Sequence, residues 1–277
     1  MTRAACIVGY PVKHSRSPRL HGYWLKRLGI DGDYRAEEVG PEAFPAFLSS
    51  LAARGYVGCN VTQPHKEAAF AASEPDARAK GVGAANTLWL DKGRLRSTNT
   101  DVEGFIGSLD AASPGWDKRT SSAVVLGAGG ASRAIVYGLI ERGIETIHLA
   151  NRTFAKAEAF RAQYGERIHP VRWEEKQRVL QGADLLVNTT SLGMKGQPAL
   201  DLDISGLADG AVVSDIVYIP LETPLLAAAA RRGLKTANGL DMLLHQAVRG
   251  FELWFGVRPE VTAEQFEMLA ADIRAAG

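Results

Sequence analysis

The pattern of hydrophobic and polar positions divides the chain into segments of two kinds, which follow each other in turn. Short apolar runs of strand length, such as 4–10 and 56–62, are followed by stretches with the spacing of a helix, such as 17–29. Ser17 is the candidate N-cap of this helix and Gly29 its stop. The alternation of the two patterns predicts an α/β fold.

The middle of the chain repeats this alternation most regularly. Helical stretches at 131–143, 154–165 and 174–182 separate successive apolar runs. The apolar runs themselves fall at 123–130, 146–153, 167–173, 183–190 and 211–218. Because parallel strands need long crossover connections, the pattern predicts a parallel, doubly wound sheet with helices on both faces.

The two ends of the chain follow a different plan. Residues 86–100 read as a β-hairpin that turns at Asp91-Lys92-Gly93. The loop at 110–122 is rich in Ser, Pro and Gly and suits a boundary between domains. Two amphipathic helices, 241–256 and 262–277, close the sequence.

Composition narrows the classes of function. The 277 residues carry a formal net charge of +1, with no basic or acidic block that would favour nucleic acid or an anionic membrane. No apolar run reaches the roughly 18 residues that a membrane helix needs, and the N-terminus shows no secretory signal. The histidines and cysteines lack metal-ligand spacing, and Cys6 and Cys59 are expected to be buried free thiols in a cytoplasmic protein.

A glycine-rich turn joins the strand at 123–126 to the next helix. Gly127 and Gly129 stand where a dinucleotide-binding turn needs close backbone approach, with the helix N-terminus behind them for a pyrophosphate. The third glycine of the usual pattern is replaced by Ser132. The strand, turn and helix together still favour dinucleotide binding over a turn used only for packing.

The residues after the next strand indicate which dinucleotide. An NAD site usually offers an acid about 20 residues after the glycines, to hold the ribose 2′-hydroxyl. This chain instead offers Asn151, Arg152 and Thr153, with Lys156 one turn further. A guanidinium pairs well with a 2′-phosphate, so the sequence predicts NADP.

Several polar residues in the first part of the chain suit either a structural or a chemical role. Lys66 falls in the first turn of a helix predicted to begin at Pro64, where the helix dipole disfavours a cation. Ser15 and Ser17 precede another helix and suit either N-capping or a carboxylate cradle. Asn86 and Asp101, each at the edge of an apolar run, read alone as turn or cap residues.

Taken together, these clusters resemble the shikimate dehydrogenase family. The segments HSRSP, NVTQPHK, GAANT, NTDVEG, GAGGAS, NRT, NTTSLGM and GLDMLLHQ stand in that family's order and run through essentially the whole chain. The resemblance implies NADPH-dependent, reversible reduction of 3-dehydroshikimate to shikimate, in the biosynthesis of aromatic amino acids. Two places depart from the common pattern: Ser97-Thr98 before NTD, and Ile219-Pro220-Leu221 after Tyr218. We expect both to adjust the fit of the substrate.

The resemblance also implies roles for individual residues. Lys66 and Asp101 match the catalytic pair, and Ser15 and Ser17 match the residues that bind the substrate carboxylate. The residues that would hold ring hydroxyls, position the pair or approach the substrate are Asn60, Thr62, Asn86, Asp101, Gln246 and Tyr218. The residues that would bind the cofactor are Gly127, Ala128, Gly129, Gly130, Ala131, Asn151, Arg152, Thr153, Lys156, Thr190, Ile216, Gly239 and Met242.

The same resemblance implies a two-domain architecture. A substrate-binding α/β domain with a mixed sheet would comprise 1–103 and 238–277, and a Rossmann-like NADP domain would comprise 104–237. Lys66 would then supply the proton that a hydride-reduced ketone needs, and Asp101 would orient its amine. The sequence leaves a monomer and a homodimer equally open.

Two other functions remain compatible with parts of the sequence. A quinate/shikimate dehydrogenase with looser substrate choice or dual cofactor use would keep the same motifs. A catalytically silent NADP-binding sensor would keep the glycine-rich turn and lose the proton-transfer pair. The presence of both Lys66 and Asp101 argues against the sensor.

Overall fold

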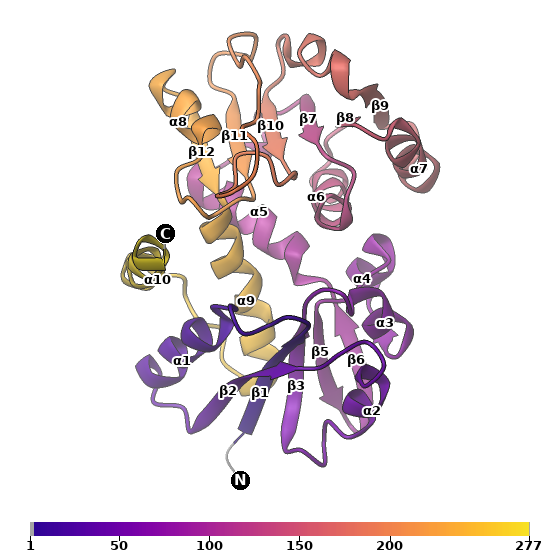
Figure 1. Cartoon of the computed structure of the whole chain (residues 1–277), viewed down its shortest axis with the longest axis vertical. Coiled ribbons are helices and arrows are strands. Elements are labelled where there is room, and N and C mark those ends of the chain that lie inside the picture. The colour runs from indigo at the N-terminus through magenta and orange to yellow at the C-terminus, as the bar shows by residue number, and fades with distance from the viewer. Residues whose placement is uncertain (1–2, 277) are drawn as a thin grey trace. The chain divides into compact units, whose positions relative to one another are not determined.

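The computed structural model describes residues 3–276, which form two compact units (Figure 1). One unit comprises the described residues up to Glu103 together with Leu244–Leu269. The other comprises Gly104–Leu243 and the residues from Ala270 onward. Residues 1, 2 and 277, at the outer ends of the predicted domains, lie outside the described range. Three helices carry the chain from one unit into the other: α5 (Thr100–Ala112), α9 (Gly239–Phe255) and α10 (Ala263–Ala276).

The unit around Gly104–Leu243 contains a fully parallel sheet. Its strand order is β12-β11-β10-β7-β8-β9, which is the order of the Rossmann fold and confirms the predicted doubly wound sheet. The strands are β7 (Ser122–Leu126), β8 (Thr146–Asn151), β9 (Ile168–Arg172), β10 (Leu185–Asn188), β11 (Val212–Asp215) and β12 (Lys235–Asn238).

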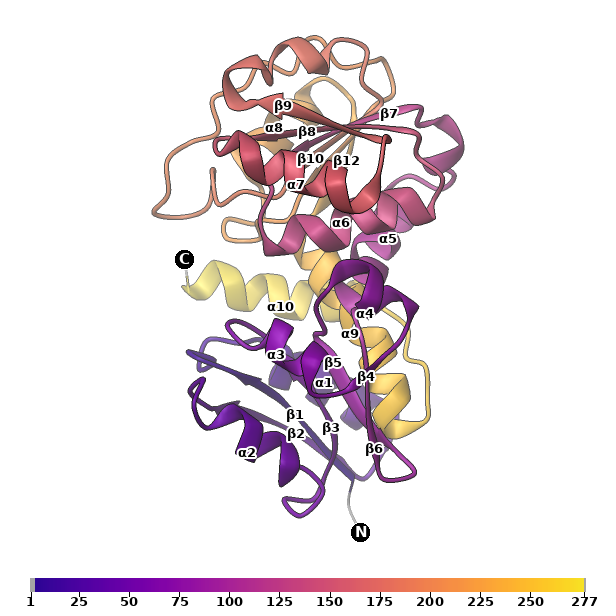
Figure 2. The same cartoon turned by 90° about the vertical axis from the view of Figure 1, so that its right-hand side faces the viewer.

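Helices bury both faces of this sheet, as parallel strands require. Helices α5, α6 (Gly130–Glu141) and α7 (Phe154–Tyr164) lie on one face (Figure 2). They contribute Phe105, Leu139 and Phe160 to the core. On the other, α8 (Pro224–Arg231) packs through Leu226.

The predicted helix at 174–182 is wrong. Two 3-10 turns, η2 (Trp173–Glu175) and η3 (Arg178–Leu180), occupy the region. Leu180 is the only fully buried residue of that span, so the segment lacks the apolar stripe that stabilises a longer helix.

The unit that contains the N-terminal strand has a mixed sheet, as predicted. Its order is β2-β1-β3-β5-β6-β4, in which β5 pairs antiparallel with both β3 and β6. The predicted hairpin is confirmed, because Lys92 and Gly93 take φ values of 50° and 79° at its tip. The strands are β1 (Arg3–Gly9), β2 (Gly32–Glu38), β3 (Tyr56–Val61), β4 (Glu74–Pro75), β5 (Thr87–Asp91) and β6 (Arg94–Thr98).

Two sets of helices cover this mixed sheet. Helices α1 (Ser17–Arg27) and α9 pack together, and the indole of Trp254 donates to the carbonyl of Leu88 at 2.8 Å. Gly58 is required here, since a Cβ atom would lie 2.2 Å from the indole nitrogen. The short helices α2 (Phe44–Ser49), α3 (Lys66–Ala71) and α4 (Ala77–Val82) border a second core that contains Cys6 and Cys59 as buried free thiols, as predicted.

Among residues 3–276, no helix has both the length and the apolar character needed to cross a membrane.

Candidate active site

The glycine-rich turn after β7 has the geometry of a phosphate-binding turn. Gly127 adopts a φ of +102°, and a Cβ atom there would lie 2.7 Å from the hydroxyl of Thr189. Gly129 and Gly130 instead face open space, with no atom within 4 Å of the position that a Cβ would take. Ser132, which replaces the third glycine, is fully buried and donates to the carbonyl of Gly129 at 2.7 Å. Its hydroxyl therefore stabilises the turn and leaves the approach to the backbone clear.

The residues at the end of β8 continue this surface. Asn151 accepts a hydrogen bond from the amide of Ala128 at 3.0 Å and donates to the carbonyl of Thr153 at 2.8 Å. The amide of Ala128 is thus already used, and the first amides of α6, which include that of Ala131, are the donors that a helix leaves for an anion.

Cationic side chains complete this surface. Arg152 is exposed, and Lys156 lies on α7; neither forms an ion pair with a carboxylate within residues 3–276. Unobstructed glycines and helix amides fit the pyrophosphate of NADP, and two cations without an ion-pair partner fit its 2′-phosphate.

The next two strands end in loops that carry other predicted residues. Thr190 donates through its hydroxyl to Asn188 at 2.7 Å, and the amide of Ile216 donates to the carbonyl of Asn188 at 3.1 Å. Gly239, at the start of α9, packs against Ile216 so closely that a Cβ atom would lie 2.2 Å from its carbonyl oxygen. Met242 packs against the core beneath α5, α6 and α7.

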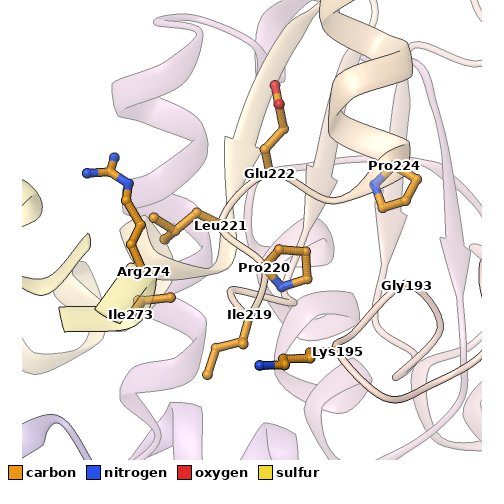
Figure 3. Close-up of a pocket in the computed structure, with 9 residues that line it drawn as sticks. All are labelled: Gly193, Lys195, Ile219, Pro220, Leu221, Glu222, Pro224, Ile273 and Arg274. Carbon is orange, nitrogen blue, oxygen red and sulfur yellow. The ribbon is translucent and has the colours of Figure 1, made fainter. Parts of the chain in front are cut away.

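Directly after Tyr218, the chain forms the wall of an open pocket of about 720 Å³ (Figure 3). Ile219 and Leu221, the residues that depart from the common family pattern, both line it. None of the site residues predicted from the sequence lines this pocket. Its lining residues are Gly193, Lys195, Ile219, Pro220, Leu221, Glu222, Pro224, Ile273 and Arg274.

In the other unit, the predicted catalytic pair is in direct contact. Lys66 donates from Nζ to Oδ2 of Asp101 at 2.5 Å, and the two side chains are 34% and 18% exposed. Lys66 is the first residue of α3 and Asp101 lies in the first turn of α5, so two helix starts meet here. Partial exposure leaves the ammonium accessible to a ligand while the carboxylate holds it in place.

Asn86 holds the other oxygen of the aspartate. Its amide nitrogen donates to Oδ1 of Asp101 at 2.9 Å. Its side-chain oxygen, Oδ1, accepts from the backbone amide of Thr100 at 2.8 Å and lies 3.1 Å from the hydroxyls of both Thr87 and Thr100. Asn86 is 4% exposed, so this orientation is fixed by a buried network.

The same network reaches two further predicted residues. The hydroxyl of Thr100 lies 3.3 Å from Oε1 of Gln246 on α9. Asn60, at the end of β3, donates to the hydroxyl of Thr87 at 3.1 Å and accepts from the hydroxyl of Tyr34 at 2.6 Å. Lys66, Asp101, Asn86, Gln246 and Asn60 therefore belong to one connected set of polar side chains.

The two serines at the start of α1 do not have the capping roles that the sequence predicts. Ser15, not Ser17, satisfies an amide of the helix start, since its hydroxyl accepts from the nitrogen of Ser17 at 3.2 Å. Ser17 is itself the first helical residue and is 3% exposed, so the expectation that it is the N-cap is wrong.

The start of α3 also differs from the prediction. Pro64 follows a cis peptide bond and precedes α3 instead of opening it. Thr62 lies between β3 and α3, with a half-buried side chain. Within residues 3–276, the Thr62 side chain forms no hydrogen bond with Lys66, Asp101 or Asn86.

The structure brings in residues that sequence reasoning missed. Tyr34, Thr87 and Thr100 all hold predicted site residues through hydrogen bonds. Thr100 is part of the NTDVEG segment, so its position offered a signal, whereas Tyr34 sits in an ordinary strand sequence with no distinguishing neighbours.

His21 is a further buried residue of this region. Its ring stacks on that of Tyr34 with centroids 4.1 Å apart, and neither ring nitrogen has a partner in hydrogen-bond geometry among the described residues. Burial lowers the pKa of His21 to about 3, although the nearby Asn60 side chain acts in the opposite direction. The imidazole is therefore neutral under ordinary conditions. Within the part of the chain that the structure describes, no three His, Cys, Asp or Glu side chains gather as a metal site.

Three family models match successive parts of the chain. A shikimate dehydrogenase substrate-binding domain matches residues 7–88, and a shikimate/quinate 5-dehydrogenase model matches residues 111–194. A shikimate 5′-dehydrogenase C-terminal domain matches residues 239–263. A relative from Rhodopseudomonas palustris (strain TIE-1), named shikimate dehydrogenase (NADP(+)), is 62% identical over 271 residues, covering 98% of this chain and 97% of the relative.

Solved structures agree with these matches. Shikimate 5-dehydrogenase from Thermus thermophilus, in complex with NADP(H) and shikimate, is 37% identical with a TM-score of 0.84, covering 99% of this chain and 100% of that one. Quinate dehydrogenase from Corynebacterium glutamicum, in complex with NAD, is 30% identical with a TM-score of 0.88, covering 98% and 99%. With relatives this similar along nearly its whole length, the chain belongs to the shikimate dehydrogenase family.

Proposed function

We propose that this protein is an NADP-dependent shikimate dehydrogenase that reversibly reduces 3-dehydroshikimate to shikimate. The observation that carries the proposal is the contact between Lys66 and Asp101, held by Asn86, in a chain 62% identical to a relative with that name. A lysine–carboxylate pair suits a reaction that moves one proton to or from a substrate oxygen.

Lys66 is the proton donor in the direction of reduction. When bound, NADPH supplies the hydride that reduces the ketone carbon. The Lys66 ammonium then gives one proton to the carbonyl oxygen, so the ketone gains a hydride and a proton and becomes an alcohol. In the oxidative direction, the neutral amine accepts the hydroxyl proton.

Asp101 and Asn86 keep the amine in place for this step. Asp101 uses Oδ2 for Lys66 and Oδ1 for Asn86, so the carboxylate cannot turn without losing one of two hydrogen bonds. A positioned amine spends less time in unproductive orientations, which raises the fraction of productive encounters.

The other predicted residues of this unit would bind the substrate. Ser15 and Ser17, at the start of α1, would hold the carboxylate, since small hydroxyls and helix amides are good anion partners. Asn60, Thr62, Asn86 and Gln246 would hold ring hydroxyls, and Tyr218 would approach from its own loop. The network that links Asn60, Asn86 and Gln246 supports a common role for these three.

The Rossmann-like unit would bind NADP. The turn from Gly127 to Ala131 would receive the pyrophosphate, and Arg152, with Asn151, Thr153 and Lys156, would receive the 2′-phosphate. Thr190 and Ile216 would also contact the cofactor, and Gly239 and Met242 would lie near the nicotinamide. The domain limits inferred from the sequence, 1–103 with 238–277 and 104–237, stay a prediction.

The cellular setting follows from the reaction. The product shikimate is a precursor in aromatic amino-acid biosynthesis in this family, and we infer that the protein serves that route in the cytoplasm, as a monomer or homodimer.

A second candidate is a quinate dehydrogenase that accepts NAD. The similarity to the quinate enzyme complexed with NAD favours it, whereas the cations Arg152 and Lys156 favour NADP. Quinate carries one more ring hydroxyl than shikimate, so a site for it must offer room for that group.

An absorbance assay distinguishes the two candidates. The purified protein is offered shikimate or quinate, each with NADP or NAD, and reduced cofactor is followed. Turnover confined to shikimate with NADP supports the proposal, and comparable turnover of quinate or NAD supports the second candidate. NADP binding with no turnover of any pair would leave a cofactor-binding protein without this activity.

A further inference from the structure

A buried carboxamide–carboxylate contact joins the ends of two neighbouring strands. Asn188 ends β10 and Asp215 ends β11, and the two residues are register partners in the parallel sheet. Asn188 donates from Nδ2 to Oδ1 of Asp215 at 3.0 Å. Asn188 is fully buried and Asp215 is 1% exposed. The contact lies at the carboxyl edge of the sheet, where ligands bind in folds of this kind.

Asp215 holds the loop that follows β11 through hydrogen bonds at both ends of that loop. Its Oδ1 also accepts from the amide of Val217 at 3.1 Å, and its Oδ2 accepts from the hydroxyl of Thr223 at 2.7 Å. Thr223 in turn caps α8, with its hydroxyl 3.3 Å from the amide of Leu226. One carboxylate therefore ties down both ends of the segment that contains Tyr218 and that forms a wall of the pocket in Figure 3.

Asn188 controls the loop that follows β10. Its Oδ1 accepts from both the amide and the hydroxyl of Thr190, at 3.1 and 2.7 Å. Its Nδ2 also lies 3.2 Å from the carbonyl of Leu192. The amide and hydroxyl of Thr190 thus depend on the orientation of the same carboxamide that contacts Asp215.

Burial makes this arrangement strict. A buried polar group that loses its partner pays the full cost of desolvation, so each member favours the one geometry that satisfies the others. Burial raises the pKa of Asp215, and the bonds from Thr223, Val217 and Asn188 lower it. The carboxylate oxygens accept from three donors within the described residues, and these hydrogen bonds hold the carboxylate in one orientation.

We propose that Asn188 and Asp215 form a positioning pair that fixes the Thr190 and Tyr218 loops together, so that affinity for cofactor and for substrate depends on one buried contact. The proposal rests on the proposed function, which assigns Thr190 to the cofactor and Tyr218 to the substrate. Neither member of the pair is a catalytic residue, since each acts through its loop.

The test measures the dissociation constant of NADPH by fluorescence titration, together with KM and kcat for shikimate. Asp215→Ala is expected to raise both the dissociation constant and KM by roughly 10- to 100-fold, the effect of losing hydrogen bonds to a charged group. Asp215→Asn keeps an oxygen for Asn188 and Val217 and is expected to restore most of both affinities. The fall in kcat is expected to be smaller than the rise in KM, since Lys66 and Asp101 keep their contact.

Asp184→Ala is the matched control. Asp184 precedes β10 at the opposite edge of the same sheet and accepts from the amides of Ser121 and Ser122 and the hydroxyl of Ser121. Its loss should lower Tm and leave the NADPH dissociation constant and KM within about twofold. If Asp215→Ala behaves in the same way, changing Tm alone, the pair has only a structural role and the proposal is overturned.

Thr223 provides a second route should Asp215→Ala not fold. Thr223→Val removes the hydroxyl and releases one end of the Tyr218 segment, whereas Thr223→Ser keeps it. KM for shikimate is expected to rise in the valine variant and to return toward the wild-type value in the serine variant. Equal KM values in the two variants would overturn the proposal. Absence of shikimate turnover in the unmodified protein would instead refute the proposed function, and the NADPH titration of Asp215→Asn and Asp215→Ala would still test the Thr190 half of the pair.

Discussion

At the scale of single residues, Asp101 matters because both of its oxygens are in use. Lys66 and Asn86 take one oxygen each, and Asn86 is itself held by the amide of Thr100. The sequence identifies Lys66, Asn86 and Asp101 through their motifs. Thr87 and Thr100 lie within the GAANT and NTDVEG segments, so the motifs pointed to their positions, whereas nothing in the strand sequence around Tyr34 shows that its hydroxyl meets the Asn60 side chain.

Arg152 gives the sharpest prediction at this scale. Arg152→Ala removes the guanidinium proposed for the 2′-phosphate, so KM for NADP should rise roughly 10- to 100-fold, the range for a charge-assisted hydrogen bond. KM for NAD should change little, because NAD lacks that phosphate. Arg161→Ala is the control, since Arg161 lies on the same α7 and pairs with Glu166. An Arg152→Ala variant with unchanged KM for NADP would remove Arg152 from the phosphate site.

At the scale of elements, the strand–turn–helix from β7 to α6 was predictable because each part has its own signal. Glycines mark the turn, an apolar run marks the strand, and the 3.6-residue spacing marks the helix. The helix expected at 174–182 failed because spacing alone does not supply buried contacts. The start of α3 was misplaced by two residues, because a proline before a helix and a proline at its first position look alike in sequence.

The turn itself makes a prediction at this scale. Gly127→Ala places a Cβ in the left-handed region and 2.7 Å from the Thr189 hydroxyl, so the turn must shift. We expect the NADPH dissociation constant to rise at least about tenfold, with a loss of stability of roughly 1–3 kcal/mol.

Gly143→Ala is the comparison for that variant. Gly143 follows α6 with a φ of +83° and no atom near its missing Cβ, so it shares the backbone strain without the steric clash. It should lose about 1 kcal/mol of stability and keep its NADPH affinity. Equal NADPH affinities in the two alanine variants would show that the close approach at Gly127 has no bearing on the cofactor.

At the scale of the whole molecule, the chain leaves its first unit at Glu103 and returns to it at Leu244. Hydrophobic periodicity predicts the elements on both sides of these crossings, and it carries no information on which distant segments share a core. The return of α9 to the first unit is secured by the contacts of Phe251 with Trp24 and of Trp254 with Leu88, which join residues far apart in the sequence. The family resemblance, and not the periodicity, suggested such a return.

His21 links one buried ring to the stability of the whole fold. Its pKa of about 3 lies below the unfolded value near 6.5, so the unfolded chain binds the extra proton between these pH values. The lowered pKa of His21 therefore has no effect on the free energy of unfolding above about pH 6.5. As pH falls from there toward 3, it lowers that free energy by up to about 1.4 kcal/mol per pH unit. Asp241, with its pKa raised by burial to about 6, contributes the opposite slope between about 6 and 4.

Urea unfolding of the protein and of His21→Phe at pH 7.5, 6.0 and 5.0 isolates the histidine, because Asp241 is common to both. The difference in free energy of unfolding should shift in favour of the phenylalanine variant as pH falls. A pH-independent difference for His21→Phe would mean that His21 has the same pKa in the folded and the unfolded protein, which would contradict the lowered pKa.

The proton transfer proposed for Lys66 is best measured through kcat of Lys66→Ala for shikimate oxidation with NADP. Purified Lys66→Ala and the exposed-lysine control Lys80→Ala are assayed beside the unmodified protein, with NADPH binding measured in parallel. We expect kcat of Lys66→Ala to fall by roughly 10²–10⁴-fold, the usual contribution of a general acid–base group, with the NADPH dissociation constant unchanged. A Lys66→Ala variant that binds NADPH and turns over shikimate at the rate of Lys80→Ala would show that Lys66 does not transfer the proton.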